Sequence, residues 1–157
     1  MIKIYTYLVC LLCICSFARG SELVRTQQLY FEESLTSVKH IKHYTLTAMP
    51  EDGRFMRLVS HEVDDSGEAI AFIVTPIHSQ TYAIKQKDLA AVGLSQLSDG
   101  LLLAVVTHDP AGSTVNLRYP IVVNLSTGAA KLLVPLNSKV LSLAYPLVRL
   151  GRLLDRD

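Results

Sequence analysis

Histidine side chains are the first candidates for chemistry in this chain, because imidazole binds metals and transfers protons near neutral pH. His40 and His43 are three residues apart and could share one face of a helical turn as metal ligands. Lys39 and Lys42 flank them, and their positive charges oppose a bound cation. The spacing indicates no third ligand, so a solvated basic turn is the better interpretation.

A second candidate group combines His108 and Asp109 with Ser113. Neighbouring side chains on a strand point to opposite faces, so His108 and Asp109 would not orient one another. The pair is better interpreted as the start of a turn before Pro110. The chain also lacks the short motifs of phosphate-binding loops, dinucleotide sites, serine hydrolases and zinc proteases. We therefore predict no enzyme, no metal and no cofactor, and keep a hydrolase only as a third alternative.

Length and composition limit the remaining classes of protein. The chain has 157 residues, of which 50% are hydrophobic and 18% are charged, and its formal net charge is +1. These values suit one globular domain with a single core. A near-neutral charge and the absence of tryptophan argue against direct binding of nucleic acid. We expect a monomeric domain that binds neither nucleic acid nor a membrane.

The N-terminal segment, residues 1–20, resembles a secretory signal peptide, with Lys3 before an apolar stretch and small residues at its end. Its apolar stretch is shorter than the roughly 20 residues that a membrane helix needs. It also holds all three cysteines (Cys10, Cys13 and Cys15), but no histidine or carboxylate that would complete a metal site.

Three interpretations of this segment stay open: a start of translation further downstream, a contribution to the first strand, or export. The family resemblance described below favours the first two and implies a cytoplasmic protein, with an exported protein as the alternative. The chain then divides into the apolar segment over 1–20, a β domain over 21–147 and a frayed, weakly amphipathic tail over 148–157.

Short apolar runs separated by turn residues predict that the domain is mostly β. Residues 69–75 (AIAFIVT) and 101–107 (LLLAVVT) are continuous apolar runs, which are typical of buried strands. One short helix is expected within 86–97, and a helical turn within 34–42. Further strands are expected over residues 23–31, 44–48, 55–61, 81–84, 114–125 (with a break at Pro120) and 130–135.

The most distinctive segment is Thr114–Asn124, which reads TVNLRYPIVVN. It resembles the T-x-N-L-x-A-P-I-V-I-N segment of the flagellar assembly factor family, FliW. Residues 72–76 (FIVTP), residues 88–94 (DLAAVGL) and Tyr145-Pro146-Leu147 resemble further segments of that family, in the same order. The likeness extends from about Leu29 to Leu147.

The chain departs from the family pattern at two places. Residues 34–39 (SLTSVK) stand where the family usually has G-[IL]-P-G-F-E, and Tyr119 stands where its motif has alanine. The chain is therefore identified as a diverged member.

The resemblance implies a small antiparallel β-barrel-like fold with one or two short helices and no enzymatic activity. It also implies a cytoplasmic protein that binds newly made flagellin and the RNA-binding translational regulator CsrA. Flagellin would occupy the factor and release CsrA, which would then silence the translation of flagellin. Such a partner switch needs no cofactor. The alternative is an exported small β domain with a structural or adhesive role.

Candidate partner-binding residues fall into an acidic group and a motif group. Carboxylates in a predicted turn could steer a basic partner, although a solvated turn is the simpler explanation. The polar and aromatic residues of the motif region could cap turns, pack in the core or anchor a partner. The two groups are Glu62, Asp64 and Asp65, and Asn116, Arg118, Tyr119, Asn124 and Tyr145.

Overall fold

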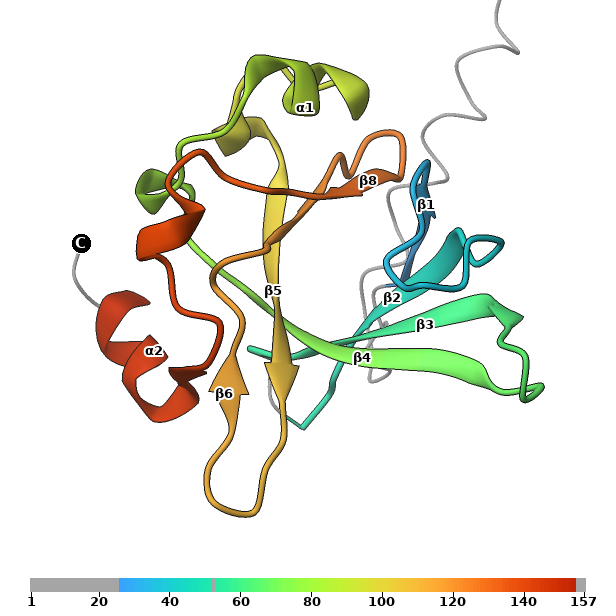
Figure 1. The fold of residues 1–157 in the computed structure, drawn as a ribbon, viewed down its shortest axis with the longest axis horizontal. Coiled ribbons are helices and arrows are strands. Elements are labelled where there is room, and N and C mark those ends of the chain that lie inside the picture. The colour runs from blue at the N-terminus through green and yellow to red at the C-terminus, as the bar shows by residue number, and fades with distance from the viewer. Residues whose placement is uncertain (1–25, 52, 155–157) are drawn as a thin grey trace, which may run out of the picture.

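The computed structural model describes residues 26–51 and 53–154 (Figure 1). The apolar N-terminal segment and its three cysteines lie outside these residues. Within the described part, no helix has the length and apolar character that crossing a membrane would require.

Among the described residues, nine strands form one sheet that closes on itself. The barrel follows the order β4-β3-β2-β1-β8-β7-β5, and β5 pairs back with β4. In Figure 1, β5 stands upright while β3 and β4 run to the right, which shows how strongly the sheet coils. The barrel strands are β1 (Thr26–Phe31), β2 (His43–Ala48), β3 (Met56–Val63), β4 (Ala69–Pro76), β5 (Leu101–Thr107), β7 (Ile121–Val123) and β8 (Ala129–Leu132).

Two short strands, β6 (Thr114–Val115) and β9 (Tyr145–Pro146), continue the sheet beyond β5. The barrel-like fold predicted from the sequence is confirmed, with one difference in strand direction. β1 and β8 pair in parallel, whereas the other pairs are antiparallel. No hairpin joins β1 to β8, which lie far apart in the chain, so no tight turn dictates an antiparallel pair.

The main core fills the barrel and is built from alternate residues of its strands. Leu58 and Ser60 of β3 are buried, whereas Arg57 and His61 on either side of them are exposed. The continuous apolar run of β5 is buried at its centre, as predicted. The run of β4 is buried only near its end, because its first residues lie beside the exposed β3–β4 turn. The largest fully buried side chains of this core are Phe31, Ile41, Tyr44, Leu58, Leu103 and Ile121.

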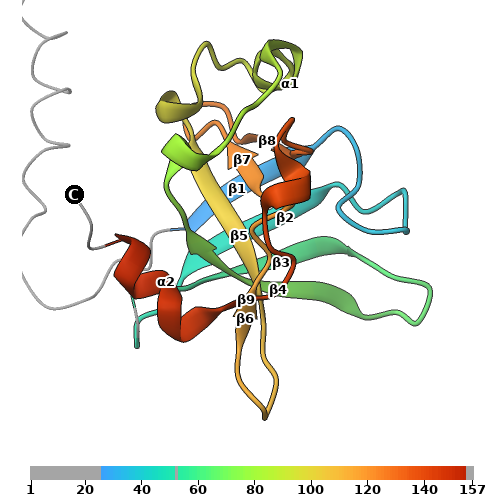
Figure 2. The ribbon, with the colours of Figure 1, turned by 60° about the vertical axis from the view of Figure 1, so that its left-hand side comes forward.

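Two helices cover parts of the barrel. The predicted short helix is α1 (Gln86–Ala91), which lies above β8 in Figure 1 and packs Leu89 against Leu102 and Leu133. The prediction of a frayed tail is wrong, because residues 147–154 form the helix α2 (Leu147–Leu154). Its Leu150 is only 5% exposed and belongs to a small cluster with Ala104 and Val115. Figure 2 shows α2 beside the barrel, near β6 and β9.

Single 3₁₀ turns occupy Ser79–Thr81 (η1), Leu97–Asp99 (η2) and Ser138–Val140 (η3). The strand predicted over 81–84 is therefore wrong. This segment is held by a neighbouring loop instead, since Leu136 N donates to Ala83 O at 2.7 Å and Asn137 Nδ2 donates to Thr81 O at 2.8 Å.

The helical turn predicted over 34–42 is also wrong, because hydroxyl side chains take the backbone partners that a helix would need. Ser34 Oγ donates to Val38 O at 2.8 Å and accepts from Thr36 N at 3.2 Å. Thr36 Oγ1 accepts from Val38 N at 3.2 Å. The apolar residues of this bend still face the core, where Ile41 is fully buried.

Candidate functional site

The acidic group lies at the turn between β3 and β4. Asp64 Oδ1 accepts hydrogen bonds from Ser66 Oγ at 2.6 Å, Ser66 N at 2.8 Å and Glu68 N at 3.1 Å. The Ser66 hydroxyl, followed by these backbone N–H groups, lowers the pKa of the Asp64 carboxyl. Asp64 thus holds the turn together, and Asp65 beside it is exposed to solvent.

Glu62 is half-buried at the end of β3 and reaches across to the start of β2. Its Oε2 accepts from His43 N at 3.1 Å and from Lys42 N at 3.3 Å, and its Oε1 lies 2.5 Å from His43 Nδ1. Burial raises the pKa of Glu62, but the hydrogen bonds, led by that of the His43 ring, outweigh it and lower the pKa to about 2. The carboxylate therefore stays ionised and fixes the ring of His43.

The motif residues form the connection between β6 and β7. Asn116 Oδ1 accepts from Arg118 N at 3.1 Å and from Tyr119 N at 3.2 Å, as a turn-capping asparagine does. Arg118 Nε donates to Leu141 O at 3.0 Å. Tyr145 of β9 pairs with Val115, so it lies beside this connection, and both tyrosines are half-buried. The structure thus brings four of the five motif-group residues to one side of the barrel.

Asn124, the fifth residue of that group, lies elsewhere and is only 7% exposed. Its Nδ2 donates to Val92 O at 2.9 Å, and its Oδ1 accepts from Ser126 N at 3.0 Å. Asn124 therefore ties the end of α1 to β7 and caps the turn that leads to β8. These contacts support the turn-capping interpretation.

The histidines weighed as metal ligands bind separate protein groups. His40 Nε2 lies 2.9 Å from Val63 O, while His43 is held by Glu62. Across the part of the chain that the structure describes, no three histidine, cysteine or carboxylate side chains are arranged to hold a metal ion. His108 Nδ1 lies 3.0 Å from Ser113 Oγ, and Asp109 Oδ1 accepts from Ala111 N at 2.7 Å, so His108 and Asp109 serve a turn.

A row of rings on the outer face of β1–β3 was missed by sequence reasoning. Tyr30, His43 and His61 lie on adjacent strands, and Tyr30 pairs directly with His43. The ring centroids of Tyr30 and His43 are 5.2 Å apart, and those of His43 and His61 are 6.4 Å apart. The alternation within each strand predicts that each residue faces outward, but only the pairing of the strands shows that the three rings are neighbours.

A small hollow lies between the end of β1, α1 and β8. Its volume is about 20 Å³, and it is lined by Glu32, Glu33, Ala91, Val92, Ala130 and Lys131. A hollow of this size has room for one water molecule and is far smaller than a substrate pocket.

Comparison with known proteins identifies the family. Residues 19–147 match the family model described as FliW protein. The flagellar assembly factor FliW of Leptospira biflexa is 32% identical over 110 residues, which cover 67% of this chain and 71% of that protein. FliW of Clostridium botulinum is 30% identical over 110 residues, covering 67% of this chain and 76% of its own length.

The fold agrees with this assignment. A crystal structure of the flagellar assembly factor FliW superposes with a TM-score of 0.61 at 21% identity, covering 82% of this chain and 89% of that one. This structural similarity supports the barrel fold, whereas the family assignment rests on the match to the family model. The chain belongs to the FliW family and is a flagellar assembly factor, not an enzyme.

Proposed function

We propose that this protein acts in the cytoplasm, where it binds flagellin and a CsrA-type translational regulator and couples flagellin synthesis to filament assembly. The observation that carries the proposal is the match of residues 19–147 to the FliW family. Flagellin and the regulator are alternative partners in this proposal, so binding of flagellin releases the regulator. Such a switch depends on protein surfaces and requires no bond-making chemistry.

The surface best suited to a basic, RNA-binding regulator lies at one end of the barrel, where the ends of four strands meet. The end of β1, the start of β2, the end of β3 and the start of β4 meet there, because these strands are antiparallel neighbours. We call this region the acidic end. It carries Glu32, Glu33, Glu62, Asp64, Asp65 and Glu68 against Lys39 and Lys42. Charge of this sign favours encounter with a positively charged protein.

Calorimetric titration tests the two partnerships directly. The full chain is titrated with flagellin and, separately, with the host's CsrA-type regulator, after circular dichroism has verified that the sample is folded. We expect saturable binding in both titrations, and displacement of bound regulator when flagellin is added. Absence of binding to both partners by a folded sample would refute the proposed function.

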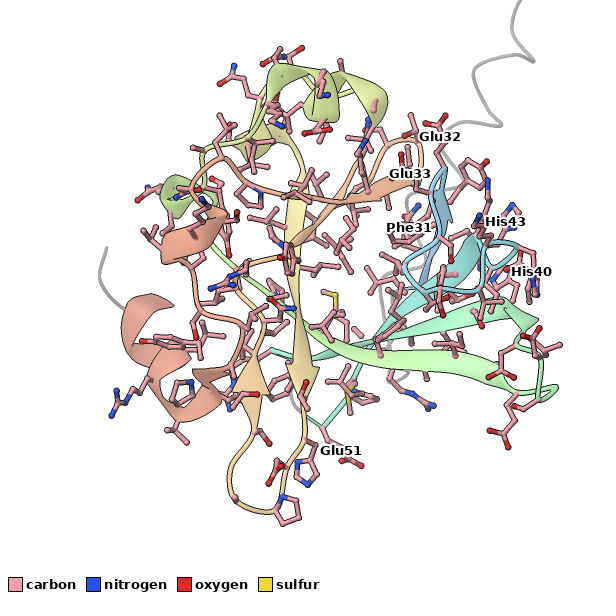
Figure 3. The ribbon with its side chains drawn as sticks, in the orientation of Figure 1. Phe31, Glu32, Glu33, His40, His43 and Glu51 are labelled. Carbon is pink, nitrogen blue, oxygen red and sulfur yellow. The ribbon has the colours of Figure 1, made fainter. Side chains whose placement is uncertain are left out.

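Charge reversal tests the acidic end without disturbing its turn. Asp65 is exposed, whereas Asp64 holds the turn, so D65K is the cleaner substitution. We expect D65K to weaken binding of the regulator about 3- to 10-fold, mainly by slowing association. E51K is the matched control, since Glu51 is exposed and Figure 3 shows it far from Glu32, Glu33 and His43. Equal affinities of the two variants would contradict a role for the acidic end.

The second candidate function is an exported β domain, which the signal-like pattern of residues 1–20 favours. N-terminal sequencing of the protein isolated from cells distinguishes the two. A first residue near Arg19 or Ser21, on protein recovered outside the cytoplasm, would support export. Cytoplasmic protein that starts within residues 1–18, or at a start of translation further downstream, would support the partner switch.

A further inference from the structure

The three rings on the outer face of β1–β3 lie side by side and are exposed to solvent among the residues that the structure describes. Tyr30 is 45% exposed, the side chain of His43 is 54% exposed, and His61 is exposed as well. A tyrosine and two histidines in a row present flat faces and ring edges to solvent. Tyrosine is enriched at interfaces because its ring buries a large area with few rotatable bonds, and the two imidazole rings extend the flat surface beside it.

Hydrogen bonds at their edges hold both imidazole rings in place. Glu62 Oε1 holds His43 at Nδ1, and Thr45 Oγ1 lies 2.7 Å from His61 Nε2. Thr45 Oγ1 in turn donates to Gln28 Oε1 at 3.1 Å, so the network reaches across to β1. A partner that stacks on these rings would lose little side-chain entropy in ordering them.

The charges around the rings indicate what kind of group would stack there. Glu32 and Glu33 lie two and three residues after Tyr30, at the end of β1, and Figure 3 shows both glutamates on the same side of the molecule as His43. Asp65 lies just beyond the end of the strand that carries His61. Within the described residues, none of these three carboxylates forms an ion pair with a basic side chain. A nucleic acid, although flat bases stack well on rings, would be repelled by this rim.

We propose that Tyr30, His43 and His61 form a docking surface for arginine side chains of a basic protein partner. A guanidinium group is planar, stacks on aromatic faces and keeps its charge, whereas a lysine ammonium offers no plane to stack. The carboxylates of the acidic end outnumber Lys39 and Lys42 and supply the complementary charge, and Glu62 acts as a positioning residue for His43. Taking the RNA-binding regulator as that partner rests on the function proposed above.

Ring removal tests this surface through binding of the regulator to the full-length protein. We expect Y30A and H61A each to weaken binding about 3- to 30-fold, as loss of one stacked cation–ring contact would. Y30F keeps the ring and is expected to bind almost as the unaltered protein does. H108A removes an exposed histidine from a different hairpin and is expected to change nothing. Thermal unfolding verifies that each variant is folded, and normal binding by folded Y30A and H61A would overturn the proposal.

A second experiment does not depend on the regulator. Octa-arginine and octa-lysine peptides are added to the full-length protein, and the imidazole C–H signals are followed by nuclear magnetic resonance. We expect octa-arginine to shift the signals of His43 and His61 more than octa-lysine does, and to leave His108 unchanged. If octa-arginine causes these shifts but the regulator does not bind, the proposed binding of the regulator is refuted and the proposed arginine-docking surface is still supported. Equal shifts with both peptides, or tighter binding of a single-stranded RNA oligonucleotide, would overturn the arginine surface.

Discussion

Tyr44 places a polar hydroxyl group in the apolar core of the barrel. It is fully buried in the barrel core, and among the described side chains its hydroxyl is the buried polar atom that has no hydrogen-bond partner. Burial and, to a lesser degree, the charge of Glu62 raise the pKa of this hydroxyl. Its ring contributes to the core, packing edge-on against Phe31, while its hydroxyl loses its hydration.

We therefore expect Y44F to leave the free energy of unfolding unchanged or to raise it by about 1 kcal/mol, because it removes an unsatisfied hydroxyl. The matched control is Y82F. Tyr82 Oη donates to Leu117 O at 2.9 Å, and burial raises the pKa of Tyr82 to about 12. Y82F should destabilise the protein by about 1 kcal/mol. Denaturant unfolding measures both changes, and a marked loss of stability in Y44F would contradict this account.

Glu62 predicts a pH dependence of stability. Its pKa falls from the ordinary 4.5 to about 2 in the folded protein, so folding favours the ionised form. The resulting stabilisation is complete above pH 4.5 and is lost as the pH falls from 4.5 to about 2. We expect E62Q to be less stable than the unaltered protein at neutral pH, and the difference to vanish near pH 2.

Denaturant unfolding at a series of pH values measures this difference. E51Q, at an exposed glutamate away from the histidine network, should show no comparable difference at any pH. A constant difference between E62Q and the unaltered protein down to the lowest pH would contradict the assignment.

At the scale of elements, the turn between β7 and β8 decides how the barrel closes. Gly128 has a φ of +78°, its carbonyl accepts from Tyr30 N at 2.9 Å, and an added Cβ would lie 2.4 Å from Gln28 O. β1 can approach β8 this closely only because residue 128 has no side chain. The parallel β1–β8 pair therefore depends on a glycine in the other half of the chain.

We expect G128A to destabilise the protein by about 3 kcal/mol or more, from the left-handed backbone and from a clash with a backbone oxygen that cannot move aside. G67A separates the two effects. Gly67 has a φ of +84°, but nothing lies within 4 Å of an added Cβ, so only the backbone strain of about 1 kcal/mol applies. Thermal and denaturant unfolding compare the two variants, and equal losses would show that the close approach to β1 is unimportant.

At the scale of the whole molecule, charge is segregated although the net charge of +1 is small. The acidic end gathers carboxylates from both sides of the β3–β4 turn and from the end of β1. Its field reaches about 10 Å at 0.1 M salt and becomes much shorter as salt increases. Association with a basic regulator should therefore depend on ionic strength.

We expect the association rate with the regulator to fall about 10-fold between roughly 0.05 M and 0.5 M salt, while the dissociation rate changes less. Biolayer interferometry measures both rates. In D65K the salt dependence should be weaker. A rate that does not change with salt would place the regulator on another surface.

Local patterns in the sequence predicted most elements of this protein. The alternating residues of β2 and β3, the apolar run of β5, the helix α1 and the break at Pro120 between β6 and β7 each depend on residues close in the chain. The turn-capping behaviour of Asn116 is also local, since its partners lie two and three residues away. Such features follow from side-chain periodicity and backbone chemistry within one segment.

Tertiary contacts decided the rest. The parallel β1–β8 pair, the closure of β5 on β4 and the burial of Leu150 in α2 join residues far apart in the chain. The row of Tyr30, His43 and His61 exists only because pairing register sets three outward positions side by side. Nothing in the sequence near Glu62 indicates a partner for its carboxylate, but in the folded protein the carboxylate lies against the ring of His43. Local chemistry specifies each strand and its two faces, whereas register between distant strands determines which side chains meet.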